Sequence, residues 1–157
     1  MRTTDERLQV LGLLVQVVSG IGERAATRLE RHGLTTVDLD VLVALGEPAD
    51  RELQPTMSDL AAGTGLTPSG ATRVVDRLVS RGLVARSACA TDRRITHVAL
   101  TAAGSRLLAA ALPDHLGVLE DALRPLRSTG QLASFTDHLR RLRDALAADA
   151  EPADGAA

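Results

Sequence analysis

Residues 66–84 read LTPSGATRVVDRLVSRGLV and carry the most informative pattern in the chain. Thr67 stands where a helix N-cap belongs, and Pro68 takes the first helical position, where its missing N–H costs nothing. Gly82 ends the pattern. One face is apolar and comprises Ala71, Val74, Val75, Leu78 and Val79. The other face is polar and comprises Ser69, Thr72, Arg73, Asp76, Arg77, Ser80 and Arg81. The stretch therefore predicts an amphipathic helix with an arginine-bearing outer face.

Two shorter helices are expected upstream. One covers Val37–Leu45 and is capped by Thr35 or Thr36, and the other covers Asp59–Thr64 and is capped by Ser58. A short helix, a glycine turn and a second helix with small polar residues at its start present side chains to the major groove of DNA. A simpler interpretation is two packed helices with charged outer faces, in which Asp76 pairs with Arg73.

The apolar period changes after the helix. Leu83–Arg86 and Ile95–Leu100 alternate as short strands do, and SACATDR (87–93) lies between them, which predicts a β-hairpin with charge at its tip. Residues 66–101 hold six arginines against two aspartates, a local excess of +4 on a chain whose formal net charge is −2. A basic segment on an acidic body is typical of an anion-binding surface.

The candidate DNA contacts lie on this helix and at the hairpin tip. At the start of the helix, small residues allow close approach and backbone N–H groups favour a phosphate, and the candidates there are Thr67, Pro68, Ser69, Gly70 and Thr72. Arg73 and Arg77 can reach a guanine edge or the flanking backbone. In the hairpin, Arg93 or Arg94 can enter the minor groove, and we assign Asp92 to orienting a neighbouring arginine. The alternative is that this tip is a solvated turn.

Residues 8–29 carry two apolar stripes, which predicts a helix buried on two sides. The first stripe comprises Leu8, Leu11, Val15, Val18, Ala25 and Leu29, and the second comprises Val10, Leu14, Val17 and Ile21. Such a helix needs a packing partner for each stripe, and a second subunit is the simplest source of one. The apolar run Leu8–Ile21 is too short to span a membrane and wrongly flanked for export, so we expect no membrane partner.

Two further helices are expected after the hairpin. Thr101 caps a long one, which runs to about Leu123, is interrupted near Pro113 and ends before Pro125. The last has apolar residues at 3/4/3/4 spacing, namely Leu132, Phe135, Leu139, Leu142 and Leu146.

Residues 58–104, SDLAAGTGLTPSGATRVVDRLVSRGLVAR…TDRRITHVALTAAG, resemble the winged-helix core of the MarR family of bacterial transcription regulators. The motifs T-R-x-V-D-x-L, R-G-L-V-x-R, D-R-R and V-x-L-T-x-x-G follow one another at the family's spacing. By this resemblance Ser69, Gly70, Thr72, Arg73 and Arg77 match the recognition helix. Arg86 matches a backbone-contacting arginine, Asp92 with Arg94 the wing pair, and Arg93 a second phosphate contact. The stretch 37–56 departs from the family, because Asp38 and Asp40 put acid on the second helix and the following loop is long.

The resemblance implies a mainly α fold with a small β-hairpin wing. The expected parts are an N-terminal dimerisation helix (1–34), a winged helix-turn-helix domain (35–101), C-terminal dimerisation helices (102–148) and a disordered tail (149–157). It further implies a cytoplasmic homodimer that binds an inverted-repeat operator in double-stranded DNA, as a repressor. The competing hypothesis is a winged-helix module that binds another protein and has no specific DNA site.

Family members often bind a small anionic, commonly phenolic, effector between the dimer helices and the DNA-binding lobe. Arg24, Arg28 and His32 are the candidates here for meeting a carboxylate, although a solvated helix face explains them more simply.

The lone Cys89 excludes an intramolecular disulfide and fits a reducing cytoplasm. A redox role for it is less favoured than a bystander role, because the chain holds no resolving cysteine. His97, His115 and His138 are too scattered for a metal site. Without a nucleophile elbow, phosphate loop or metal-ligand cluster, we expect no enzyme and no cofactor.

Overall fold

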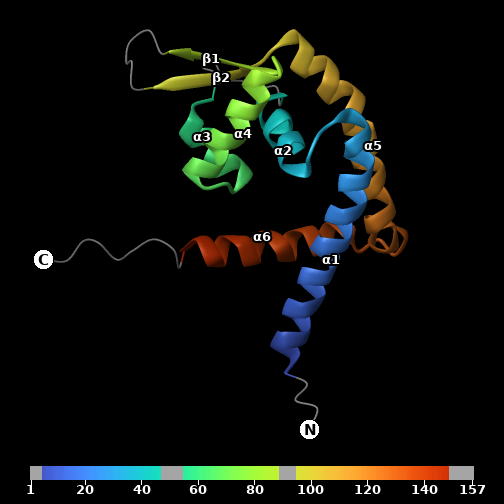
Figure 1. The fold of residues 1–157 in the computed structure, drawn as a ribbon. Coiled ribbons are helices and arrows are strands. Elements are labelled where there is room, and N and C mark those ends of the chain that lie inside the picture. Colours follow the sequence, from blue (N-terminus) through green and yellow to red (C-terminus); the bar gives the residue numbers. More distant parts are fainter. Residues whose placement is uncertain (1–4, 47–54, 89–94, 149–157) are drawn as a thin grey trace, which may run out of the picture. The chain divides into compact units, whose positions relative to one another are not determined.

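The computed structural model describes residues 5–46, 55–88 and 95–148. The elements in chain order are α1 (Glu6–Leu29), the 3₁₀ helix η1 (Glu30–His32), α2 (Thr36–Gly46), α3 (Met57–Thr64), α4 (Pro68–Ser80), β1 (Val84–Ala88), β2 (Thr96–Leu100), α5 (Ala102–Ser128) and α6 (Leu132–Ala148). The chain divides into two compact units, Met1–Val118 and Leu119–Ala157, with the boundary inside α5. The predicted class, mainly α with one small hairpin, is confirmed (Figure 1).

The core of the first unit lies where α2, α3, α4 and the hairpin meet (Figure 1). Its largest fully buried apolar side chains are Leu29, Leu39, Leu42, Leu78, Val41, Val75 and Val98. Burying each of them contributes about 1.5–3 kcal/mol of transfer free energy. One charged residue, Asp38, is buried among them.

Helix α4 forms as its sequence predicts. The Thr67 hydroxyl accepts a hydrogen bond from the Gly70 N–H at 3.1 Å, and Pro68 is the first helical residue. Gly82 adopts φ 69°, and the Leu83 N–H closes the helix end on the Leu78 carbonyl at 3.0 Å. Val79 alone departs from the expected apolar face, because 36% of it is exposed.

The hairpin pairs β1 with β2 in antiparallel register, with Val84 opposite Leu100 and Arg86 opposite Val98. β1 begins one residue later and ends two residues later than predicted. The other edge of β2 is also used, because Thr56 forms a bridge with His97 and the Val98 N–H donates to the Pro55 carbonyl at 3.0 Å. Pro55 and Thr56, which precede α3, are therefore tied to the sheet.

The root of the hairpin is joined to α5 through the main chain. The Thr101 N–H donates to the Leu83 carbonyl at 3.0 Å, and the Thr101 hydroxyl accepts from the Gly104 N–H at 3.0 Å, which confirms Thr101 as the cap. Gly104 is buried, and a Cβ there would lie 2.0 Å from the Leu83 carbonyl oxygen. Position 104 therefore admits only glycine at this separation.

The cap predicted for the helix at 59–64 is wrong. Thr56, not Ser58, caps α3: its hydroxyl accepts from the Asp59 N–H at 3.2 Å while the Asp59 carboxylate accepts from the Thr56 N–H at 2.9 Å. This reciprocal capping box satisfies two N–H groups at once, which Ser58 could not do from inside the first turn. For α2, Thr35 is the cap, as one of the two predicted alternatives.

The predicted break at Pro113 and end at Pro125 are also wrong, because α5 runs through both prolines to Ser128. A proline inside a helix removes one backbone hydrogen bond but does not oblige the helix to stop. Around Pro113, Ala111 and Val118 are buried on the same helix, and this packing offsets the lost bond.

Helix α1 leaves most of its apolar length uncovered in this single chain. Its exposed members are Leu8, Val10, Leu11, Leu13, Val15, Val17 and Val18, whereas Ala25 and Leu29 at its C-terminal end are buried. The continuous helical segment Glu6–His32 is long and apolar enough to cross a bilayer by length and composition alone. The prediction that the apolar run is too short to span a membrane, which counted only Leu8–Ile21, is therefore wrong on length. Its C-terminal end lies in the core of the first unit.

In the second unit, α6 confirms the predicted last helix. Phe135 and Leu132 are half-buried, whereas Leu139, Leu142 and Leu146 are exposed. The turn before α6 has Gly130 at φ 71°. The tail predicted for 149–157 lies outside the described residues.

Candidate nucleic-acid interface

The first turn of α4 presents small polar side chains to solvent. Thr67, Pro68, Ser69 and Thr72 are exposed and Gly70 is half-buried. Thr72 donates its hydroxyl hydrogen to the Pro68 carbonyl at 2.9 Å, and the Thr67 and Ser69 hydroxyls lie 3.3 Å apart. These local bonds fix the side chains while the helix start stays open to a ligand.

Arg73 lies one turn further along the same helix and is exposed. No hydrogen bond or ion pair to its guanidinium is formed within 5–46, 55–88 and 95–148. The simpler interpretation paired Arg73 with Asp76, but the Asp76 carboxylate is bound to Arg86 instead, at 2.5 Å. Arg73 therefore keeps all its donors available for a phosphate or a guanine edge.

Arg77 has a partner inside the protein that the sequence did not reveal. Its Nη2 and Nε donate to Asp38 Oδ1 at 2.6 Å and 3.1 Å, across from α4 to α2. Asp38 is 2% exposed, whereas the Arg77 side chain is 46% exposed. Asp38, which the sequence marks as a departure from the family pattern, is therefore an internal anchor for the recognition helix.

Asp38 is also held from its own helix start. The Thr35 N–H and hydroxyl donate to Asp38 Oδ2 at 3.0 Å and 2.9 Å. Burial raises the pKa of Asp38, but the Thr35 N–H, the Arg77 guanidinium and the Thr35 hydroxyl together lower it below its ordinary value. The buried carboxylate is ionised, and both of its oxygens are occupied.

Arg86 links the hairpin to the recognition helix through Asp76. About a third of the Arg86 side chain is exposed, at 32%, and Asp76 is more exposed, at 57%. The pair ties β1 to α4 on the surface, so water screens it. Asp92, Arg93, Arg94 and Cys89 lie outside the described residues.

One of the three effector candidates, His32, contacts a carboxylate on α5. His32 Nε2 lies 2.6 Å from Asp114 Oδ2, and Arg31 Nε lies 3.5 Å from the same oxygen. The hydrogen bond from His32 is the main cause that lowers the pKa of Asp114, and the charges of Arg31 and Arg28 add to it. Arg24 is exposed and takes no part in this cluster. A carboxylate of the protein thus already takes the hydrogen-bonding position at His32 Nε2 that a ligand carboxylate would need.

A second carboxylate on α2 lies in different surroundings. Burial raises the pKa of Asp40, and the charge of His115 on α5 works against that rise. The His115 Nδ1 atom is buried without a hydrogen-bond partner. No group of three or more metal-ligating side chains occurs among the described residues.

The positions of Asp38 and Asp59 are each indicated by a local pattern in the sequence. Thr35 with Asp38, and Thr56 with Asp59, both fit T-x-x-D before an apolar run, the pattern of a capping box. That pattern places Asp38 at the third residue of α2. It does not reveal Arg77 as the partner, which lies 39 residues further along the chain.

Comparison with known proteins supports the resemblance to the MarR family. A family model described as MarR family matches residues 32–95. The chain is 28% identical over 139 residues to the HTH-type transcriptional regulator MhqR of Bacillus subtilis, covering 88% of this chain and 92% of that protein. It is also 28% identical over 139 residues to the transcriptional repressor MprA of Escherichia coli K12, covering 87% and 78%.

Among solved structures, the chain is similar to Sco3205, a MarR family transcriptional regulator from Streptomyces coelicolor solved in complex with DNA. That likeness has a TM-score of 0.82 at 25% identity and covers 100% of this chain and 96% of the other. It extends over both flanking helical regions as well as the winged helix. Residues 32–95 therefore match the MarR family, and the chain as a whole is similar to transcriptional regulators of that family.

Proposed function

We propose that this chain is a homodimeric repressor that binds an inverted-repeat operator in duplex DNA. The observation that carries the proposal is the exposed start of α4, where fixed small polar side chains stand beside Arg73, whose guanidinium has no partner in the described part of the chain. A relative solved with DNA and another named as a repressor support it.

The dimer rests on α1. Seven large apolar residues along its N-terminal two thirds are about half exposed or more in the single chain, from Val10 at 48% to Val18 at 69%. Exposed apolar surface on both stripes of a helix is costly in water, and helices of a second copy of the chain would cover it. An inverted repeat matches the two-fold symmetry of such a dimer.

The roles at the DNA follow from the partners. Thr67, Pro68, Ser69, Gly70 and Thr72 place the backbone close to a phosphate, and Arg73 reads a base edge or grips the backbone. Arg77 and Arg86 act mainly by holding α4 and β1 in place, because their guanidinium groups are bound to Asp38 and Asp76. Arg93, Arg94 and Asp92 stay as predictions for the wing tip.

Control by a small anionic effector also stays a prediction. An incoming carboxylate at His32 would have to displace Asp114, so binding there would alter the link between η1 and α5. A regulator of transcription of this kind would work in the cytoplasm.

The test is selection of genomic fragments by the purified full-length protein, followed by anisotropy titrations of the enriched duplex over a range of salt. We expect an inverted repeat with half-sites about one helical turn apart, and affinity that falls steeply with salt. Arg73→Ala should weaken binding to that duplex, whereas Arg106→Ala, an exposed arginine on α5, should not. Enrichment of no sequence at low salt would favour the protein-interaction module instead.

A further inference from the structure

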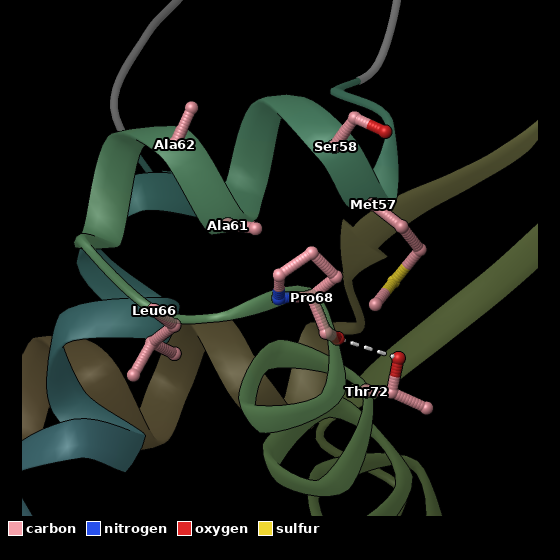
Figure 2. Close-up of a pocket in the computed structure, with 7 residues that line it drawn as sticks. All are labelled: Met57, Ser58, Ala61, Ala62, Leu66, Pro68 and Thr72. Carbon is pink, nitrogen blue, oxygen red and sulfur yellow. Dashed lines mark hydrogen bonds between the residues drawn. The ribbon is translucent and has the colours of Figure 1, made fainter. Parts of the chain in front are cut away.

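A hollow opens between the two helices of the helix-turn-helix. It has a volume of about 360 Å³ and is lined by Met57, Ser58, Ala61, Ala62, Leu66, Pro68 and Thr72. Figure 2 shows α3 with Ala61 and Ala62 on one side, and Pro68 and Thr72 at the start of α4 on the other. The hollow therefore adjoins the turn of α4 proposed to meet DNA.

The lining is apolar and carries no charged side chain. Its hydroxyls belong to Ser58 and Thr72, and Thr72 already donates to the Pro68 carbonyl. Thr72 is thus left with a methyl group and a weak acceptor to offer a ligand. A phosphate or an organic anion would find no cation in this hollow, whereas an apolar group would meet a mostly apolar lining.

Duplex DNA offers one apolar group in its major groove, the 5-methyl group of thymine. Alanine and the threonine methyl group are among the side chains suited to contact it. In helix-turn-helix proteins the second helix lies in that groove while the first crosses the backbone, so a hollow between their starts faces the edge of a nucleotide.

We propose that this hollow reads a thymine in each half-site by enclosing its 5-methyl group. The proposal rests on the proposed function and adds to it a contact from α3 and the start of α4, separate from Arg73. Ala62 lines the hollow from the α3 side and is exposed, so a larger side chain can be introduced there without displacing the core.

The test uses the full-length protein and the duplex enriched from the genome. Each thymine is replaced in turn by deoxyuridine, which keeps base pairing and removes only the methyl group. At one symmetry-related pair of positions we expect affinity to fall about fourfold for one half-site and about 15-fold for both, the loss that follows when one or two buried methyl groups are removed.

Ala62→Leu tests the assigned place. Leucine would fill the hollow, so we expect this variant to bind thymine and deoxyuridine duplexes equally, while Ala85→Leu, an exposed position on β1, retains the preference. Circular dichroism checks that both variants are folded. Specific binding of the operator without any deoxyuridine effect overturns the proposal and leaves the proposed function standing. A deoxyuridine effect that persists in Ala62→Leu shows that the methyl group is read elsewhere, and it overturns the proposal too. If no duplex is enriched, the proposed function fails first.

Discussion

The ion pair between Arg77 and Asp38 gives the sharpest prediction. Arg77→Ala leaves a carboxylate that is 2% exposed without its cation, while the two hydrogen bonds from Thr35 remain. Breaking a buried pair from one side costs about 3–5 kcal/mol. Because the Arg77 side chain is 46% exposed, water reaches the pair and we reduce the expected loss to about 2–3 kcal/mol.

Urea unfolding followed by circular dichroism, at one fixed protein concentration, measures this loss. Arg73→Ala is a matched control, because it makes the same substitution one turn earlier on the same helix and removes no ion pair seen in the described residues. We expect the control to change the free energy of unfolding by less than about 0.5 kcal/mol. Asp38→Asn combined with Arg77→Ala completes a cycle, whose coupling energy should exceed about 1 kcal/mol.

Equal stabilities of Arg77→Ala and Arg73→Ala would refute the assignment of Arg77 as an anchor. A coupling energy near zero would do the same, since it would show that the two side chains do not depend on each other. In either case Arg77 would return to the direct DNA contact that the sequence predicts for it.

The pKa of Asp38 is lower in the folded protein than its ordinary value of about 3.9, so the stability that its charge contributes is complete above that value and is lost as the pH falls through the folded pKa. The difference in unfolding free energy between the unmodified protein and Asp38→Asn should therefore shrink below about pH 4. A difference that stays constant down to pH 3 would contradict this. Arg73→Ala should reduce discrimination between the operator and a mismatched duplex by about 1–3 kcal/mol in competition titrations, and an equal loss on both duplexes would reassign it to phosphate contact. Val15→Asp, on a residue that is 57% exposed on α1, should shift the protein from dimer to monomer in light scattering, and an unchanged mass would remove α1 from the interface.

Local patterns in the sequence predicted the recognition helix and the hairpin. Thr67, Pro68, the apolar spacing and Gly82 act within a few residues of one another, so the chain itself displays where α4 begins and ends. The T-x-x-D pattern at Thr56 is equally local, and it indicates Thr56 rather than Ser58 as the cap of α3.

Contacts between distant residues could not be predicted in this way. The sequence shows an aspartate at 38 and an arginine at 77, but nothing in their spacing says that one is buried and the other bound to it. The rule that proline ends a helix failed at Pro113 for a related reason, because burial of Ala111 and Val118 supplies free energy that the local pattern does not contain.

The close approach of Gly104 to the Leu83 carbonyl fixes the root of the hairpin through main-chain atoms. Where the hairpin leaves the body of the protein, its direction is fixed by main-chain atoms that no side-chain substitution elsewhere can replace. These contacts at the root involve no residue of the segment between β1 and β2, so substitutions in that segment leave them in place. Loops from other regulators could be grafted between Ala88 and Thr96, and relatives could diverge in operator preference there while keeping one scaffold.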